Sequence, residues 1–179
     1  MKKTLIVLAH PDMSQSRLNK ALIEAIKEEG NITIHDLYAT YKTPEEIDVS
    51  KEQQLLLDHD RIVFQFPLYW FSTPGMLKYW QDMVLEYGFA YGSEGNALAG
   101  KAFKIATTAG AAQEAYESAG KMHVSMAEIL KPLETTALFT QMKFTPSFIL
   151  YGALEMTDDI LSEKAQEYKT LLTSDNWEN

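Results

Sequence analysis

Residues Thr4–Ala9, with the sequence TLIVLA, are a continuous apolar run rich in β-forming side chains. Such a run is typical of a strand that is buried on both faces of a parallel sheet. His10-Pro11 ends the run, and the segment 18–29 then shows helical spacing of its apolar residues. Gly30 predicts the C-cap of that helix. The chain therefore begins with a strand, a loop and a helix.

The same alternation of strands and helices continues along the rest of the chain. Predicted strands are 32–37, 61–66 and 101–107, with a fifth strand beginning at 136–139. A short helix is expected between the second and third strands, and longer predicted helices are 74–87, 125–134 and 160–172, the last capped by Thr157. Without a repeat or a linker, this pattern favours a single domain over residues 1–179, an α/β doubly wound parallel sheet with helices on both faces.

Composition and charge limit the classes of function. The 179 residues are 46% hydrophobic, as in ordinary globular proteins, and carry a net charge of −9. This charge repels nucleic acids and anionic membranes, so we expect no nucleic-acid partner. The absence of cysteine excludes disulfides and thiolate ligands, and the four histidines lack a paired ligand spacing, so no metal site is expected. The first apolar run is too short to span a bilayer and is not followed by a signal cleavage site, which favours a cytoplasmic location.

Three loops follow predicted strands and should meet at the carboxyl edge of the sheet, where doubly wound sheets bind ligands. The first loop, residues 10–19, contains neither G-x-G-x-x-G nor a Walker sequence, which disfavours Rossmann and P-loop sites. It offers the imidazole of His10, the hydroxyls of Ser14 and Ser16, and a helix N-terminus that favours phosphate. The alternative is that Ser16 only caps the helix and His10 closes a surface turn.

The other two loops differ sharply in side-chain size. The loop 67–75 contains three consecutive aromatic residues, Tyr69, Trp70 and Phe71. Such side chains usually enter a core, but at this edge they could pack on a planar ligand. The loop 107–112 has only small residues, which allow a flat ring to approach the backbone, although a plain turn would have the same composition. Together the loops predict one ligand with a phosphate and a ring.

At these loops the sequence resembles the flavodoxin-like NAD(P)H:quinone oxidoreductase (DT-diaphorase) family. It is most similar to the short bacterial members, which include ancillary proteins of potassium-efflux systems. The resemblance covers nearly the whole chain and implies a flavodoxin-like sheet of five strands in the order 2-1-3-4-5. The matching residues are Ala9-His10-Pro11, Ser16, Asn19, Pro67-Leu68-Tyr69-Trp70, Pro74, Leu77, Lys78, Trp80, Asp82, Val84, Gly88-Phe89-Ala90-Tyr91-Gly92 and Thr107-Thr108-Ala109-Gly110.

The resemblance also implies a bound flavin, with FMN favoured over FAD because the chain is short. The flavin phosphate would lie against residues of the first loop, namely His10, Ser16, Arg17, Leu18 and Asn19. The ring would lie between two groups of residues, Pro67, Leu68, Tyr69 and Trp70 on one side and Thr107, Thr108, Ala109 and Gly110 on the other. Relatives often have glycine at the position of Ala109, so an alanine would be strained there if the position needs a positive φ.

The activity implied by the resemblance is a two-electron ping-pong transfer of hydride from NAD(P)H through FMN to a quinone or similar acceptor. Tyr116 and His123 are the nearest matches to the family's catalytic tyrosine and histidine, although their spacing does not register exactly with it. The alternative is a tyrosine that packs on a helix and a histidine on the surface. Family members are homodimers, and the helix 74–87 would supply contacts between the subunits.

Two other functions stay open at this point. One is a flavin-binding regulatory subunit of a potassium-efflux transporter, which would place the protein at the inner face of the cell membrane. The other is a one-electron flavodoxin carrier, although carriers use a phosphate loop that begins with Thr or Ser, whereas this loop begins with His10-Pro11. A serine hydrolase would need a G-x-S-x-G elbow, and a receiver domain would need more acidic residues than Asp12 alone after the first strand.

Overall fold

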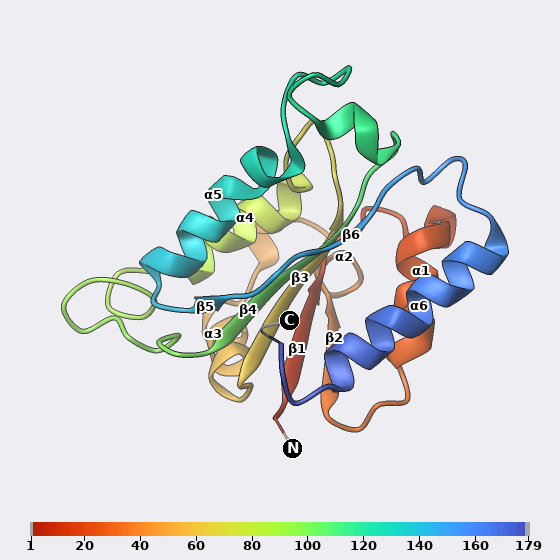
Figure 1. Ribbon diagram of the computed structural model, residues 1–179. Coiled ribbons are helices and arrows are strands. Elements are labelled where there is room, and N and C mark those ends of the chain that lie inside the picture. The colour runs from red at the N-terminus through yellow and green to blue at the C-terminus, as the bar shows by residue number, and fades with distance from the viewer. Residues whose placement is uncertain (1, 178–179) are drawn as a thin grey trace.

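The computed structural model describes residues 2–177 as one parallel sheet between two layers of helices (Figure 1). The strand order is β2-β1-β3-β4-β5, which confirms the predicted order, and a short β6 also pairs with β4. All the strand pairs of the sheet are parallel. The strands are β1 Thr4–Leu8, β2 Ile32–Asp36, β3 Arg61–Pro67, β4 Ala102–Thr108, β5 Lys143–Phe144 and β6 Phe148–Leu150.

Helices cover both faces of this sheet. On one face lie α1 (Arg17–Ile26) and α6 (Asp158–Thr173), and on the other lie α2 (Leu37–Thr40), α3 (Val49–Leu57), α4 (Gly75–Val84) and α5 (Met126–Phe139). Three short 3₁₀ helices are η1 (Met13–Gln15), η2 (Pro44–Glu46) and η3 (Gln113–Tyr116). Within residues 2–177, no helix has both the length and the apolar composition that a membrane crossing requires.

The first strand explains why two layers form. Every residue of β1 is buried, and successive side chains of a strand point to opposite faces. Leu5 and Val7 therefore join the core beneath α3, α4 and α5, whereas Ile6 and Leu8 join the core beneath α1 and α6. A strand that is apolar on both faces is stable only if helices cover both, which is the doubly wound arrangement.

The prediction of a fifth strand at 136–139 is wrong, because these residues form the last turn of α5. Thr136 and Phe139 favour strands by composition, but the buried residues Met126, Leu130, Leu133 and Ala137 continue a helical period through the segment. The edge of the sheet is instead formed by β5 and β6. Pro146 lies between these two short strands and lacks a backbone N–H to donate to the sheet.

The predicted end of the first helix is also wrong. The helix α1 ends at Ile26 with Lys27 as its C-cap, and Gly30 lies in the turn that follows. The Glu29 N–H donates to the Ile26 carbonyl oxygen, so this turn already satisfies a carbonyl at the helix end. By contrast, Thr157 caps α6 as predicted, since its side chain accepts a hydrogen bond from the Ile160 N–H.

A buried carboxylate fastens the helices on the α3 and α4 face. Glu52 is 1% exposed and accepts hydrogen bonds from His35 Nε2 at 2.8 Å, Tyr41 Oη at 2.6 Å and Trp80 Nε1 at 2.8 Å. Burial opposes ionisation, but the three hydrogen bonds outweigh it and hold the pKa of Glu52 below its usual 4.5. Glu52 thus links β2, α3 and α4 through one ionised group.

Replacing this carboxylate should destabilise the fold. We expect Glu52→Ala to lower the free energy of unfolding by about 3–5 kcal/mol, because it leaves the donors of His35, Tyr41 and Trp80 buried without an acceptor. Urea denaturation at pH 7 measures the change. The control is Glu24→Ala, which removes an exposed pair with Lys27 and should cost less than about 1 kcal/mol. Equal effects of the two substitutions would contradict the assignment.

Candidate functional site

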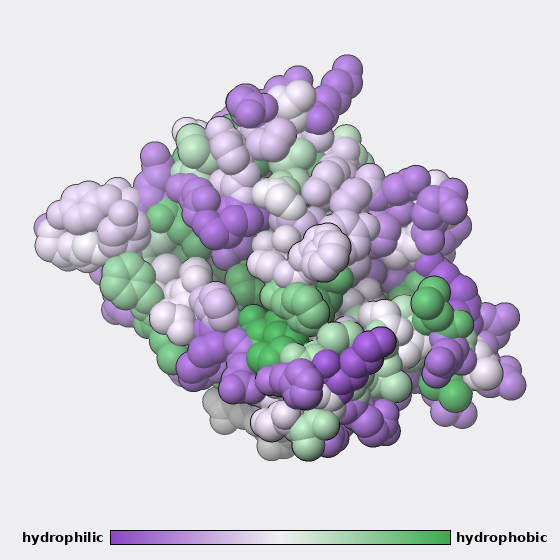
Figure 2. All heavy atoms as spheres, turned by 90° about the horizontal axis from the view of Figure 1, so that it is seen from above, coloured by the Kyte–Doolittle hydropathy of each residue, from purple (hydrophilic) through white to green (hydrophobic). Residues whose placement is uncertain are grey.

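A cleft of about 500 Å³ opens where three loops meet at the carboxyl edge of the sheet. Figure 2 looks down on this edge and shows apolar surface gathered near the middle of the face with hydrophilic residues around it. The structure therefore brings together segments that are distant in the sequence. The predicted residues that line the cleft are His10, Ser16, Arg17, Leu18, Asn19, Pro67, Leu68, Tyr69, Thr108, Ala109 and Gly110.

The first loop delivers the N-terminus of α1 to this cleft. Ser16 occupies the N-cap position and is buried, yet within the described chain its side chain makes no capping hydrogen bond. The first turn of α1 also carries no acidic residue. In the described first turn and its cap, no side chain balances the positive end of the helix dipole. A helix end in this state favours a bound phosphate. Ser16 thus holds the cap position without a side-chain capping bond, and its role toward a ligand stays a prediction.

His10 presents a neutral imidazole to the cleft. Its Nδ1 accepts a hydrogen bond from the Asp12 N–H at 3.1 Å, so the ring proton is assigned to Nε2. Burial lowers the pKa of His10 below its usual 6.5, and the nearby charge of Asp12 opposes this only in part. The Asp12 carboxylate accepts hydrogen bonds from the Ser14 N–H and hydroxyl, at 3.0 and 2.6 Å. It therefore serves the turn η1 and does not appear among the residues of the cleft.

Arg17 forms hydrogen bonds between the start of α1 and the segment that precedes and begins α6. Its guanidinium donates to Asp158 Oδ1 from Nε at 3.2 Å and from Nη2 at 2.8 Å, and it also donates to the Met156 carbonyl oxygen. These bonds hold the segment after β6 against the start of α1. As a result Ala153 and Leu154 line the cleft, together with Gln15, and the sequence had not predicted these three residues.

A chain of buried hydrogen bonds supports the floor of the cleft. Tyr168 Oη donates to Gln65 Oε1 at 2.9 Å, Gln65 Nε2 donates to Asn19 Oδ1 at 3.3 Å, and Asn19 Nδ2 donates to Thr108 Oγ1 at 3.2 Å. Burial raises the pKa of Tyr168, so its hydroxyl stays protonated and remains a donor. The Asn19 amide therefore points toward its neighbours in the fold, although the residue lines the cleft.

The aromatic loop contains a strained turn. Tyr69 and Ser72 exchange two backbone hydrogen bonds of 2.9 Å around Trp70 and Phe71, whose φ angles are 46° and 61°. Positive φ is costly for bulky residues, of order 1–3 kcal/mol each, and such strain clusters at ligand sites. The turn leaves the Trp70 side chain 94% exposed, and Trp70 is not among the residues of the cleft.

The third loop accommodates alanine without strain. Ala109 is buried, and its N–H donates to the Leu150 carbonyl oxygen at 2.8 Å. Its φ is not positive. The strain expected for an alanine at this position is therefore absent from the described loop. A Cβ added to Gly110 would meet nothing within 4 Å, because this residue borders open space. Thr107 is fully buried below the cleft, and its hydroxyl has no partner among residues 2–177.

Tyr116 and His123 lie in the longer continuation of this loop. Tyr116 ends η3, is buried, and places its ring 5.7 Å from the ring of Tyr151. His123 is exposed and has a φ of 52°. In the described structure neither residue is among those that line the cleft, so their catalytic roles stay predictions.

Comparison with known proteins gives the same picture of the fold. Residues 2–172 match the protein family described as "Flavodoxin-like fold". The "Uncharacterized NAD(P)H oxidoreductase YrkL" of Bacillus subtilis is 41% identical over 97% of this chain and 99% of its own length. The "Glutathione-regulated potassium-efflux system ancillary protein KefG" of Pectobacterium atrosepticum is 42% identical over 96% of this chain and 93% of its own.

Solved structures agree closely as well. General stress protein 14 of Treponema denticola, solved in complex with FMN, is 41% identical with a TM-score of 0.91, covering 95% of this chain and 97% of that one. An NADPH-quinone reductase from P. pentosaceus is 32% identical with a TM-score of 0.89, covering 97% and 99%. From the family match and relatives of 41% and 42% identity, we conclude that the chain belongs to the flavodoxin-like NAD(P)H oxidoreductase family.

Proposed function

We propose that this protein binds FMN in the cleft and uses it to transfer hydride from NAD(P)H to a quinone or a similar acceptor. The observation that carries the proposal is the uncapped N-terminus of α1 at one end of a cleft that the three loops build. A structurally similar protein at 41% identity was solved with FMN. Relatives that are named NAD(P)H oxidoreductase and NADPH-quinone reductase support the activity.

The residues of the first loop fit a phosphate. The backbone N–H groups at the start of α1 supply donors, the buried Ser16 hydroxyl adds another, and His10 offers Nε2–H as a neutral donor. Arg17 brings a positive charge to the same end of the cleft. Because Asp158 already neutralises part of that charge, we assign most of the phosphate binding to the helix N-terminus.

The other two loops fit a planar ring. Pro67, Leu68 and Tyr69 from the second loop and Thr108, Ala109 and Gly110 from the third loop all line the cleft, where a ring could pack against them. In the described chain the N–H groups of Trp70, Phe71 and Gly110 make no backbone hydrogen bond, so they are available to the polar edge of a ring. Bound FMN would supply the two-electron hydride chemistry that protein side chains lack. Preorganised donors at that edge would stabilise negative charge as it develops. Trp70 and Thr107, which do not line the cleft, would support flavin binding from outside the cleft and from below it.

Filling the open space at Gly110 should block FMN. Gly110 lines the cleft, and a Cβ added there meets nothing within 4 Å, so we expect a leucine at this position to take up space in the cleft. We expect Gly110→Leu to weaken FMN binding by at least about 100-fold, the effect of some 2.7 kcal/mol, and to leave the unfolding midpoint of the apoprotein nearly unchanged. Fluorescence titration of the apoprotein with FMN measures the affinity.

The matched control is Gly30→Leu, which adds the same side chain to an equally open position far from the cleft. It should bind FMN with the wild-type affinity. A colourless wild-type protein that takes up neither FMN nor FAD would refute the proposed function altogether.

Tyr116 and His123 are the proposed hydride-transfer residues, acting as additional donors beside the ring. We expect Tyr116→Phe and His123→Gln each to lower the rate of flavin reduction by NADPH roughly 10- to 100-fold, the order that a positioned donor contributes. Stopped-flow absorbance under anaerobic conditions measures this rate. Tyr116→Phe keeps the ring contact with Tyr151, so FMN affinity should stay within about threefold of the wild type. Unchanged rates in both variants would assign these residues to packing only.

An exposed aromatic cluster supports a homodimer. Tyr87 and Phe139 are 68% and 65% exposed, and Tyr91 lies between them with ring-centroid distances of 5.8 and 5.5 Å. The cluster joins the ends of α4 and α5. Exposed apolar patches of this kind mark protein interfaces, and a two-fold axis would let one patch cover its copy.

A charge in this patch should separate the subunits. We expect Phe139→Glu to shift the protein from dimer to monomer at micromolar concentration, as measured by sedimentation velocity. Ile160→Glu, at a half-exposed position of α6 on the opposite face of the sheet, should remain a dimer. A monomeric wild-type protein would contradict the proposed interface.

A second function is favoured by the relatives named ancillary proteins of a potassium-efflux system. In that case the protein would lie in the cytoplasm against a membrane transporter and regulate it through the state of the flavin site. The Tyr116 and His123 variants distinguish the two functions, because these substitutions should impair hydride transfer. A regulatory subunit would still activate its transporter when hydride transfer is lost, whereas an enzyme would have lost its role. A one-electron carrier would instead show slow quinone turnover with NADPH.

A further inference from the structure

The segment 152–158, between β6 and the first turn of α6, passes the start of α1 at the carboxyl edge of the sheet (Figure 1). Two of its residues, Ala153 and Leu154, line the cleft, and the proposed function gives neither of them a role. Leu154 is 92% exposed, so very little of the described chain covers it. A single exposed leucine is ordinary on a protein surface. This one differs because it borders a cleft and belongs to a segment that is fixed at both ends.

One end of the segment is fixed to the third loop. The Ala153 N–H donates to the Ala109 carbonyl oxygen at 3.1 Å. A tight turn follows, in which the Met156 N–H donates to the Gly152 carbonyl oxygen at 2.9 Å. Gly152 has a φ of 66°, a left-handed value that glycine adopts without a steric penalty. Leu154 therefore lies in a closed turn that is bonded to the loop proposed to contact the flavin ring.

The other end of the segment is fixed by Arg17, at the start of α1. The Arg17 guanidinium donates to Asp158 Oδ1 from two nitrogens and to the Met156 carbonyl oxygen from one. The Met156 carbonyl belongs to the turn that contains Leu154. The side chains of Arg17 and Asp158 are 42% and 93% exposed, so solvent screens the ion pair and it adds little to the stability of the fold. Its main consequence is to set the position of the segment beside the cleft.

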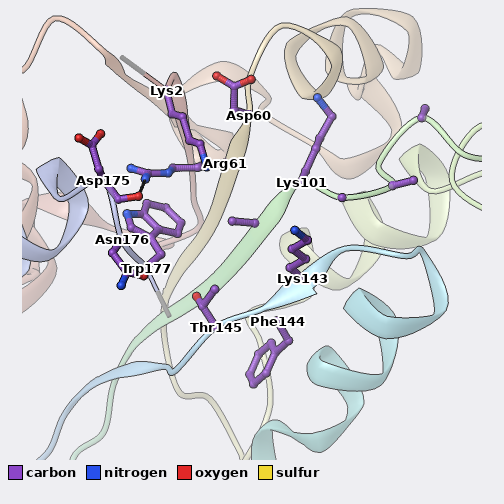
Figure 3. A pocket seen from close by; sticks show the side chains of 14 residues that line it. Lys2, Asp60, Arg61, Lys101, Lys143, Phe144, Thr145, Asp175, Asn176 and Trp177 are labelled. Carbon is purple, nitrogen blue, oxygen red and sulfur yellow. Dashed lines mark hydrogen bonds between the residues drawn. The ribbon is translucent and has the colours of Figure 1, made fainter. Parts of the chain in front are cut away.

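A second arginine, at the amino edge of the sheet, makes similar contacts in a different setting. Arg61 donates to the carbonyl oxygens of Ser174 and Asp175, at 2.8 and 2.6 Å. Figure 3 shows its guanidinium beside Asp175 and the ring of Trp177. Arg61 is only 2% exposed, so its contacts hold the C-terminal segment to the sheet within the interior. Arg17 is instead partly exposed and lines the cleft, so its contacts lie where a bound ligand would depend on them.

We propose that Leu154 is an apolar contact of the bound flavin and that Arg17 is the positioning residue that holds it at the cleft. This inference rests on the proposed function, because it concerns how the same cleft retains FMN. The flavin covers the exposed leucine, and the removal of that apolar surface from water strengthens binding. Arg17 acts through its bonds to the segment 152–158, and not mainly through its charge on the phosphate.

The two roles of Arg17 predict opposite effects of removing Asp158. If Arg17 acted by its charge, loss of the Asp158 carboxylate would unmask that charge and FMN would bind more tightly. If Arg17 acts by position, the same loss releases the segment and FMN binds more weakly. We expect Asp158→Ala to weaken FMN binding at least about threefold, and to do so mainly by faster dissociation. The control is Asp159→Ala, which removes the same charge from the same exposed first turn of α6 and should change the affinity less than about twofold.

Truncating the leucine tests the contact itself. We expect Leu154→Ala to weaken FMN binding about fivefold, the loss expected when about 40 Å² of apolar surface is no longer buried. Leu154→Met should restore the affinity to within about twofold of the wild type, because it returns a side chain of similar volume. Ile160→Ala is the control, since Ile160 is a half-exposed residue that does not line the cleft. Fluorescence titration of each apoprotein with FMN gives the affinity, and stopped-flow measurement gives the dissociation rate.

The double variant connects the two residues. With Asp158→Ala already present, Leu154→Ala should weaken FMN binding less than it does alone, because the released segment no longer holds the leucine in place. The inference is overturned if Asp158→Ala binds FMN as tightly as the wild type or more tightly, or if Leu154→Ala binds it as tightly. Either result with a wild type that binds FMN leaves the proposed function standing. A wild type that takes up no flavin would overturn both, so the two failures are distinguishable.

Discussion

The site depends most on the buried hydrogen-bond chain from Tyr168 through Gln65 and Asn19 to Thr108. This chain joins α6, β3, the first turn of α1 and the end of β4, which are four segments far apart in the sequence. Each member is neutral and buried, so breaking one link leaves a neighbour with an unsatisfied group in a low-dielectric interior. The chain therefore fixes the position of the α1 N-terminus relative to the third loop, and both of these segments line the cleft.

The strain in the aromatic loop is a second constraint that acts on the same cleft. Two backbone hydrogen bonds between Tyr69 and Ser72 hold Trp70 and Phe71 at positive φ. Leu68 also donates its N–H to the Thr108 carbonyl oxygen at 2.8 Å, so the loop leaves the sheet in register with β4. A turn held at both ends presents its backbone donors in fixed directions. Such preorganisation is what a polar ring edge requires, because no donor has to reorient on binding.

Most of the residues that line the cleft could be predicted from the sequence, and the reason is topological. In a parallel sheet the residues after each strand meet at one edge, so locating the first, third and fourth strands was sufficient to place His10, Pro67 and Gly110 together. The direction of a side chain could not be predicted in this way. Trp70 is exposed in a turn at positive φ, and the Asn19 amide turns inward because Gln65 and Thr108 bond it there. Both outcomes depend on tertiary contacts.

Ala153 and Leu154 were not predicted to line the cleft because the fifth strand was predicted at the wrong place. Their position in the cleft follows from β6, which pairs with β4, and from the hydrogen bond of the Ala153 N–H to the Ala109 carbonyl oxygen at 3.1 Å. With the fifth strand predicted at 136–139, the segment 148–154 had no assigned place at the carboxyl edge. Residue type misled the prediction there, whereas the helical spacing of buried residues through Ala137 contained the correct signal. Periodicity therefore outweighs composition at this edge of the sheet.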